Sequence, residues 1–134
     1  SCWLTLTALL EVNRPDIESS WKSFLSSKRI AWKTGTSYGH RDGWAIGVTP
    51  DYAVGVWVGN ANGSGRPNLT GISTAAPILF ELFGLLKSGT WFDKPEMQLS
   101  RVNVCQNSGF KAGNNCEKVH SITIHNSGNE TPLC

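Results

Sequence analysis

A lysine, two threonines, a glycine and a serine lie together in the stretch Lys33-Thr34-Gly35-Thr36-Ser37. An enzyme that attacks a carbonyl through a serine needs donors aimed at the developing oxyanion and groups that hold the charged end of its substrate. Thr34 and Thr36 are two residues apart, so their side chains share one face of a strand. Together with the ammonium of Lys33, these hydroxyls suit a carboxylate. Gly35 lets a substrate approach the backbone closely. The stretch therefore predicts one wall of an acyl-transfer site.

The residues that follow predict two more strands, so that the motif lies on the first strand of an antiparallel sheet. A polar turn comes after Ser37, residues 44–49 are typical of a strand, and residues 52–58 are typical of another. An edge strand offers unpaired N–H and C=O groups to an extended peptide, as this chemistry requires. We expect Trp44 and Trp57 in the core of this sheet.

Several motifs resemble the transpeptidase domain of bifunctional class A penicillin-binding proteins, of which a Lys-Thr-Gly element is one signature. They are Lys33–Ser37, Arg41-Asp42-x-Trp44, Ile46–Pro50 and Val54–Asn60. Further motifs resemble the penicillin-binding protein 1C subgroup of that family. These are Asn13-Arg14-Pro15, Gly65-Arg66-Pro67, Leu69-Thr70-Gly71 and the cysteine-containing tail. We expect Arg41 and Asp42 to form an ion pair that shapes the turn after the motif.

The resemblance implies a peptidoglycan D-alanyl-D-alanine transpeptidase that uses a serine nucleophile and no cofactor. Lys33, Thr34, Gly35 and Thr36 would be the catalytic element, with the backbone N–H of Thr36 as an oxyanion donor. Thr34, Thr36, Ser37 and Tyr38 would bind the stem peptide or a β-lactam. The resemblance also implies a bacterial periplasmic location at the outer face of the inner membrane. The membrane itself would be reached only through an N-terminal anchor absent from this chain.

The serine nucleophile is not expected within these residues. Ser19-Ser20-Trp21-Lys22 fits Ser-x-x-Lys, but its apolar neighbours are spaced for one helix face, and Ser19 and Lys22 share the polar side. Ser127-Gly128-Asn129 resembles the middle motif of the family but follows Lys33, and a turn is the better interpretation. The chain alone is therefore expected to be inactive. The alternative is a non-catalytic periplasmic module that holds cell-wall peptide or a partner protein at its sheet edge or tail.

Length and charge limit the remaining possibilities. The chain has 134 residues with 12 basic and 10 acidic side chains, and a net charge of +2. It has no basic stripe, so nothing indicates a nucleic-acid partner. Its longest apolar run, residues 75–86, is broken by Pro77 and Glu81 and does not predict a membrane span.

The sequence predicts an α+β fold, in which two or three helices pack on the antiparallel sheet and a small β-rich tail follows. The expected helices are residues 2–12, residues 16–26, and a helix capped by Thr74 that runs to about Leu86. We predict a boundary near residue 92. Residues 1–92 would form the C-terminal segment of a transpeptidase domain, and residues 93–134 an incomplete extension.

Three of the four cysteines lie in the tail. In an oxidising compartment, Cys105 and Cys116 are candidates for a disulfide. The competing interpretation is a metal site built from the tail cysteines and the two tail histidines, namely Cys105, Cys116, His120, His125 and Cys134. Because the spacing contains no Cys-x-x-Cys pair, the sequence predicts no metal.

Overall fold

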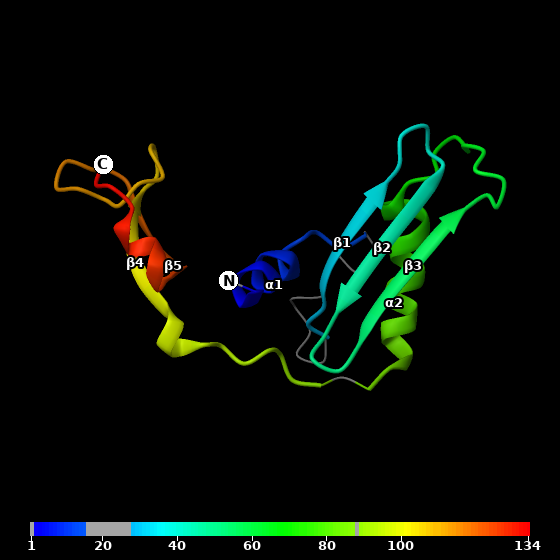
Figure 1. The fold of residues 1–134 in the computed structure, drawn as a ribbon, viewed down its shortest axis with the longest axis horizontal. Coiled ribbons are helices and arrows are strands. Elements are labelled where there is room, and N and C mark those ends of the chain that lie inside the picture. The colour runs from blue at the N-terminus through cyan, green and yellow to red at the C-terminus, as the bar shows by residue number, and fades with distance from the viewer. Residues whose placement is uncertain (1, 16–27, 88) are drawn as a thin grey trace. The chain divides into compact units, whose positions relative to one another are not determined.

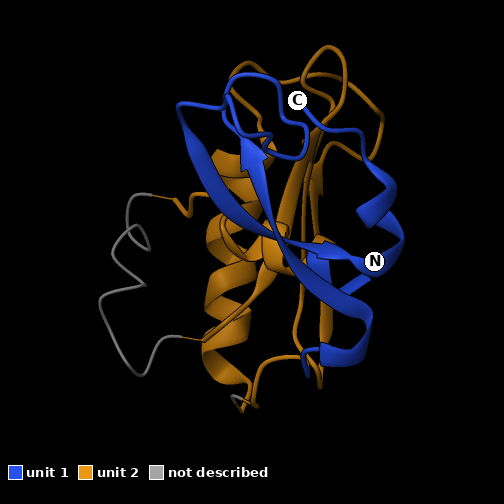
Figure 2. Cartoon of the chain, turned by 90° about the vertical axis from the view of Figure 1, so that its left-hand side faces the viewer, with its two compact units in different colours: residues 1–4, 93–134 blue, residues 5–92 orange. Residues whose placement is uncertain are grey.

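The computed structural model describes residues 2–15, 28–87 and 89–134 and has an α+β architecture, as predicted (Figure 1). The described residues form two compact units, 5–92 and 1–4 with 93–134 (Figure 2). The helices are α1 (Cys2–Leu10) and α2 (Ala76–Leu85), with a π-helix at Gly71–Ala75 and 3₁₀ turns at Glu96–Gln98 and Asn126–Glu130. The strands are β1 (Ala31–Thr36), β2 (Asp42–Val48), β3 (Ala53–Gly59), β4 (Leu99–Cys105) and β5 (Val119–His125).

The first sheet confirms the three antiparallel strands predicted around the motif. Its strand order is β1-β2-β3, so β1, which carries the motif, lies at an edge of the sheet among the described residues. The turn from β1 to β2 uses left-handed backbone at Gly39 (φ 75°) and His40 (φ 53°). A glycine adopts this conformation without steric cost, and histidine is one of the residues that tolerate it best. This short turn fixes the register in which Thr34 pairs with Ala45.

One face of the first sheet is packed by α2, which lies behind the strands in Figure 1. Small residues make this close packing possible: Ala45 is fully buried, and a Cβ added to Gly47 would lie 2.7 Å from Phe83. Trp32, with only 1% of its surface exposed, meets Phe80 edge to face with ring centroids 4.9 Å apart. Its indole N–H donates to the carbonyl of Val12. Trp32 is therefore a central aromatic side chain of this core.

The prediction that Trp44 and Trp57 lie in the core is wrong. The two residues are cross-strand partners, and each has 45% of its surface exposed. They point to the sheet face opposite α2, together with Ile46, which is 52% exposed. The residues that face α2 from β2 are instead Ala45 and Gly47, because they leave the helix room to approach.

The helical segment after the long loop begins earlier than predicted. Thr70, rather than Thr74, is the cap: its hydroxyl accepts a hydrogen bond from the N–H of Ser73. Thr74 lies inside the π-helix and donates its hydroxyl to the carbonyl of Thr70 at 2.6 Å. α2 has Pro77 in its first turn, as predicted, and ends at Leu85.

The ammonium of Lys28 holds the C-terminal end of α2. It donates to the carbonyls of Phe83, Gly84 and Leu86, which have no partner within the helix. The helix expected over residues 16–26, and with it Ser19-Ser20-Trp21-Lys22, lies outside the described residues. None of the helices in the described ranges is long and apolar enough to cross a membrane.

Candidate active site

The backbone of β1 presents part of the motif to the open edge of the sheet. The N–H of Ser37 donates to the carbonyl of Asp42 at 3.0 Å, so these two residues form a hydrogen-bonded pair. Hydrogen-bonded pairs alternate along an antiparallel ladder, which assigns the next one to Gly35 and Trp44. The backbone groups of Thr34 and Thr36 therefore point away from β2. The N–H of Thr36 is a donor directed at the edge, as an oxyanion donor must be.

The side chains of the motif lie on both faces of the strand. Thr34 and Thr36 share the face of the sheet that α2 covers, as their spacing of two residues predicts. Lys33 is exposed on the opposite face, and its ammonium donates to the carbonyl of Thr34 at 2.8 Å. This carbonyl points away from β2, toward the open edge of the sheet. The lysine therefore reaches the edge from one face of the sheet, whereas the side chains of Thr34 and Thr36 lie on the other face.

Gly71 fixes the hydroxyl of Thr36. Its N–H donates to Thr36 Oγ1 at 3.0 Å, and this bond uses an acceptor site of the hydroxyl while leaving its proton to be donated elsewhere. A Cβ on Gly71 would lie 2.4 Å from the carbonyl oxygen of Trp44 and 2.6 Å from that of Gly35. Only glycine can approach the sheet this closely. This role of Gly71 does not follow from local sequence patterns, because its contact with Thr36 spans 35 residues.

Replacing Gly71 by alanine should lower the free energy of unfolding of the chain by about 1–3 kcal/mol, the usual cost of forcing atoms into packed structure. The matched control is Gly84→Ala in α2, where an added Cβ meets nothing within 4 Å. It should stabilise the chain by about 0.5–1 kcal/mol, because alanine is the better helix former. Urea titrations of both variants measure the difference. Equal stability of the two variants would mean that Gly71 does not contact β1.

Ser37 and Tyr38, the other predicted substrate-binding residues, lie at the start of the turn. The hydroxyl of Ser37 accepts the N–H of Asp42 at 2.8 Å and so helps to close the turn. Tyr38 has 97% of its surface exposed and is available to a ligand. The ion pair expected between Arg41 and Asp42 does not form. Asp42 instead accepts the indole N–H of Trp57 at 2.8 Å.

The long loop after β3 folds back onto the β1–β2 turn. The N–H of Arg66 donates to the carbonyl of His40, whose Nδ1 lies 3.1 Å from the carbonyl oxygen of Leu69. His40 is thus engaged by the loop. A hollow of about 420 Å³ is lined here by Gly39, His40, Gly65, Arg66, Pro67 and Asn68. Residues 33–36 do not line it, so this hollow is not the carboxylate site predicted beside Lys33.

The disulfide candidates Cys105 and Cys116 lie in the compact unit that contains the tail, residues 93–134. Both are thiols in this structure, and their pairing remains a prediction. They do come close to each other, and Cys134 joins them. His120 and His125 are not part of this group.

Comparison with known proteins gives partial matches of a consistent kind. No protein-family model matches the chain. It is 46% identical over 59 residues to penicillin-binding protein 1C of Escherichia coli (strain K12), which covers 44% of this chain and 8% of the relative. It is 30% identical over 89 residues to penicillin-binding protein 1A of Clostridium perfringens (strain ATCC 13124). This match covers 65% of this chain and 11% of the relative. Penicillin-binding protein 4 of Bacillus subtilis (strain 168) is 45% identical over 38 residues, which are 28% of this chain and 6% of the relative.

The matched segments span only about a tenth or less of the length of these relatives. The similarity therefore concerns a segment and not a whole protein. Part of this chain is homologous to penicillin-binding proteins.

Proposed function

We propose that residues 1–92 are the C-terminal segment of a serine-type D-alanyl-D-alanine transpeptidase domain that cross-links peptidoglycan and binds β-lactams. Residues 93–134 would be a small extension of the penicillin-binding protein 1C type. The observation that carries the proposal is the edge strand β1, which holds Lys33 on one face and Thr34 and Thr36 on the other, beside an open backbone edge. The partial homology to penicillin-binding proteins supports it.

In the proposed reaction, a serine outside residues 1–134 attacks the carbonyl of the penultimate D-alanine of a stem peptide. The N–H of Thr36 donates to the oxyanion that forms, in the manner of an oxyanion hole. The terminal D-alanine then leaves with a proton, and an amine of a neighbouring stem peptide takes the acyl group from the serine. A β-lactam would acylate the same serine by ring opening, so that its leaving amine stays attached to the acyl group. This chemistry requires no metal or organic cofactor.

The terminal carboxylate of the substrate would lie beside the hydroxyls and the lysine. Thr36 can donate its proton because Gly71 supplies the hydrogen bond that its oxygen accepts. Lys33 has two further donors besides the one used on Thr34, and its charge attracts a carboxylate more strongly as a substrate displaces water. Ser37 and Tyr38 would contact the substrate further along the edge.

The exposed face of the first sheet supports the presence of further domain structure around this segment. Trp44, Ile46 and Trp57 form an apolar surface on the face that α2 does not cover, and Lys33 lies on that same face. We propose that the part of the protein that carries the nucleophile packs there. It would place the serine near Lys33 and the open edge. The protein would act in the bacterial periplasm, at the outer face of the inner membrane.

Labelling with a fluorescent penicillin tests the proposal. The 134-residue chain alone should not be labelled covalently, whereas a protein extended upstream should take up one equivalent. Peptide mapping by mass spectrometry should place the acylated serine outside residues 1–134. Acylation of Ser19, or of any serine of this chain, would contradict the proposal. An extended protein that is not labelled would favour the alternative, a non-catalytic module that binds cell-wall peptide.

A further inference from the structure

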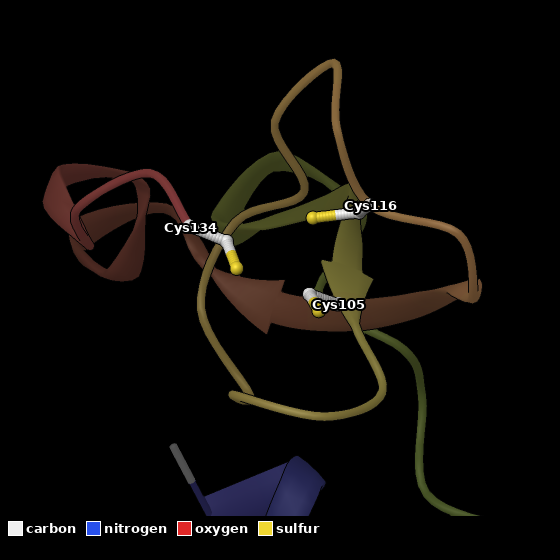
Figure 3. Close-up of side chains that lie close together, drawn as sticks. All are labelled: Cys105, Cys116 and Cys134. Atoms are coloured by element: carbon white, nitrogen blue, oxygen red, sulfur yellow. The ribbon is translucent and has the colours of Figure 1, made fainter.

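Three of the four cysteines meet in the tail, although they are far apart in the sequence. Cys105 ends β4, Cys116 lies between β4 and β5, and Cys134 is the final residue of the sequence. Their side chains point toward a common space (Figure 3), and the three Sγ atoms all lie within 4.8 Å of one another. Cys2 is not part of this group.

Backbone hydrogen bonds hold each of these cysteines in place independently of its sulfur atom. The N–H of Cys105 donates to the carbonyl of Phe110 at 2.9 Å, and that of Cys116 donates to Gly113 at 3.2 Å. The N–H of Cys134 donates to the carbonyl of Lys111 at 2.8 Å. The three thiols are therefore brought together by the fold of the tail and need no bond between sulfurs.

The sulfur of Cys105 is surrounded by donors. The backbone N–H and the hydroxyl of Ser108, together with the backbone N–H of Asn107, hydrogen-bond to it. Such N–H groups stabilise a thiolate because they donate to the charged form. The thiolate is the form of cysteine that binds a metal.

The tail has little apolar core to stabilise it. Within residues 93–134, the buried hydrophobic side chains are Val104 and Cys105 alone. Units of this size usually depend on disulfides or a bound metal, because they cannot bury enough apolar surface. A disulfide would use two of the three sulfurs and leave the third thiol beside it. A tetrahedral metal ion would use all three.

We propose that Cys105, Cys116 and Cys134 bind one thiophilic divalent cation, of which zinc is the representative, through three thiolates. The fourth position of the tetrahedron is filled by solvent or by an external ligand. Zinc–sulfur bonds of about 2.3 Å place sulfurs about 3.8 Å apart, so the thiols need to close by at most about 1 Å. The ion ties together the end of β4, the segment before β5 and the final residue.

The histidines considered from the sequence do not complete the site. Strands β4 and β5 form an antiparallel pair in which His120 lies opposite Val104, and Cys105 lies opposite Val119. Because side chains alternate along a strand, His120 points to the face opposite Cys105. His125 lies at the far end of β5, where its Nδ1 is 2.7 Å from the hydroxyl of Ser127. The sequence predicts no metal because its cysteines form no Cys-x-x-Cys pair. The fold brings three thiols together without such a pair.

Cobalt(II) titration of the reduced, metal-free chain tests the proposal, because thiolate-to-cobalt charge transfer and the intense d–d bands of tetrahedral cobalt report both ligand type and geometry. One equivalent should produce both signals, and zinc should displace the cobalt. Replacing any one of the three cysteines by serine should weaken binding at least about 100-fold, more than the loss of a residue that only supports a ligand. Cys2→Ser is the matched control and should bind as the parent chain does.

Thiol protection provides a measurement that needs no variant. Bound zinc should protect three cysteines from alkylation, so that mass spectrometry finds only Cys2 modified, and removal of zinc should expose all four. A stable disulfide within the cluster under mildly reducing conditions would overturn the proposal. So would cobalt spectra without charge-transfer bands, or binding that requires Cys2.

Discussion

Replacing Lys33 by alanine in the protein extended upstream should slow acylation by a fluorescent penicillin by about 10²–10³-fold, the usual cost of removing one preorganised electrostatic group from an acyl-transfer site. The ammonium of Lys33 lies at the open edge of β1, 2.8 Å from the carbonyl oxygen of Thr34. A β-lactam carboxylate bound there would lose its nearest cation. Stopped-flow or gel-based measurement of the second-order acylation rate gives the effect directly.

The matched control is Lys87→Ala, which removes an exposed lysine from beyond the end of α2 and should leave the acylation rate unchanged. Both variants should unfold at the same urea concentration as the parent protein, since Lys33 is also exposed. A Lys33→Ala protein that acylates at the parental rate would remove Lys33 from the proposed site. An equal loss in both variants would point to a general effect of charge.

The strands of the first sheet could be predicted from the sequence, whereas the face that the helix covers could not. Residues 44–48 are apolar on both sides of the strand, so alternation alone does not distinguish the faces. Side-chain size places Trp44 and Trp57 in the core, but the packed face carries Ala45 and Gly47. A helix that approaches a sheet closely requires small residues beneath it. In this sheet the small residues mark the packed face, and the tryptophans lie on the other face.

The candidate sites differ in how much the sequence reveals of them. The Lys33–Ser37 motif is contiguous, so its position on a strand and the shared face of its threonines follow from local periodicity. The hydrogen bond from Gly71 to Thr36 and the cluster of three thiols each join residues far apart in the chain. Their formation depends on loop paths and strand register, which local patterns do not determine.

The second large effect is expected in the core. Trp32→Ala should lower the free energy of unfolding of the chain by about 3–5 kcal/mol, as usual when a large aromatic side chain is removed from a packed interior. Trp32 is 1% exposed, packs against Phe80, and donates its indole N–H to Val12. The substitution creates a cavity and leaves the Val12 carbonyl without this partner. Urea unfolding followed by circular dichroism measures the loss.

Trp44→Ala is the control that separates this effect from the loss of any tryptophan. Trp44 lies on the open face of the sheet with 45% of its surface exposed, so its removal should cost about 1 kcal/mol, as is typical of substitutions that create no cavity. In the extended protein the same substitution should cost more, because the proposed nucleophile-bearing part would cover that face. An unchanged cost there would show that Trp44 stays exposed and that the further structure packs elsewhere. Comparing the two proteins thus tests both the core and the proposed position of the active-site serine.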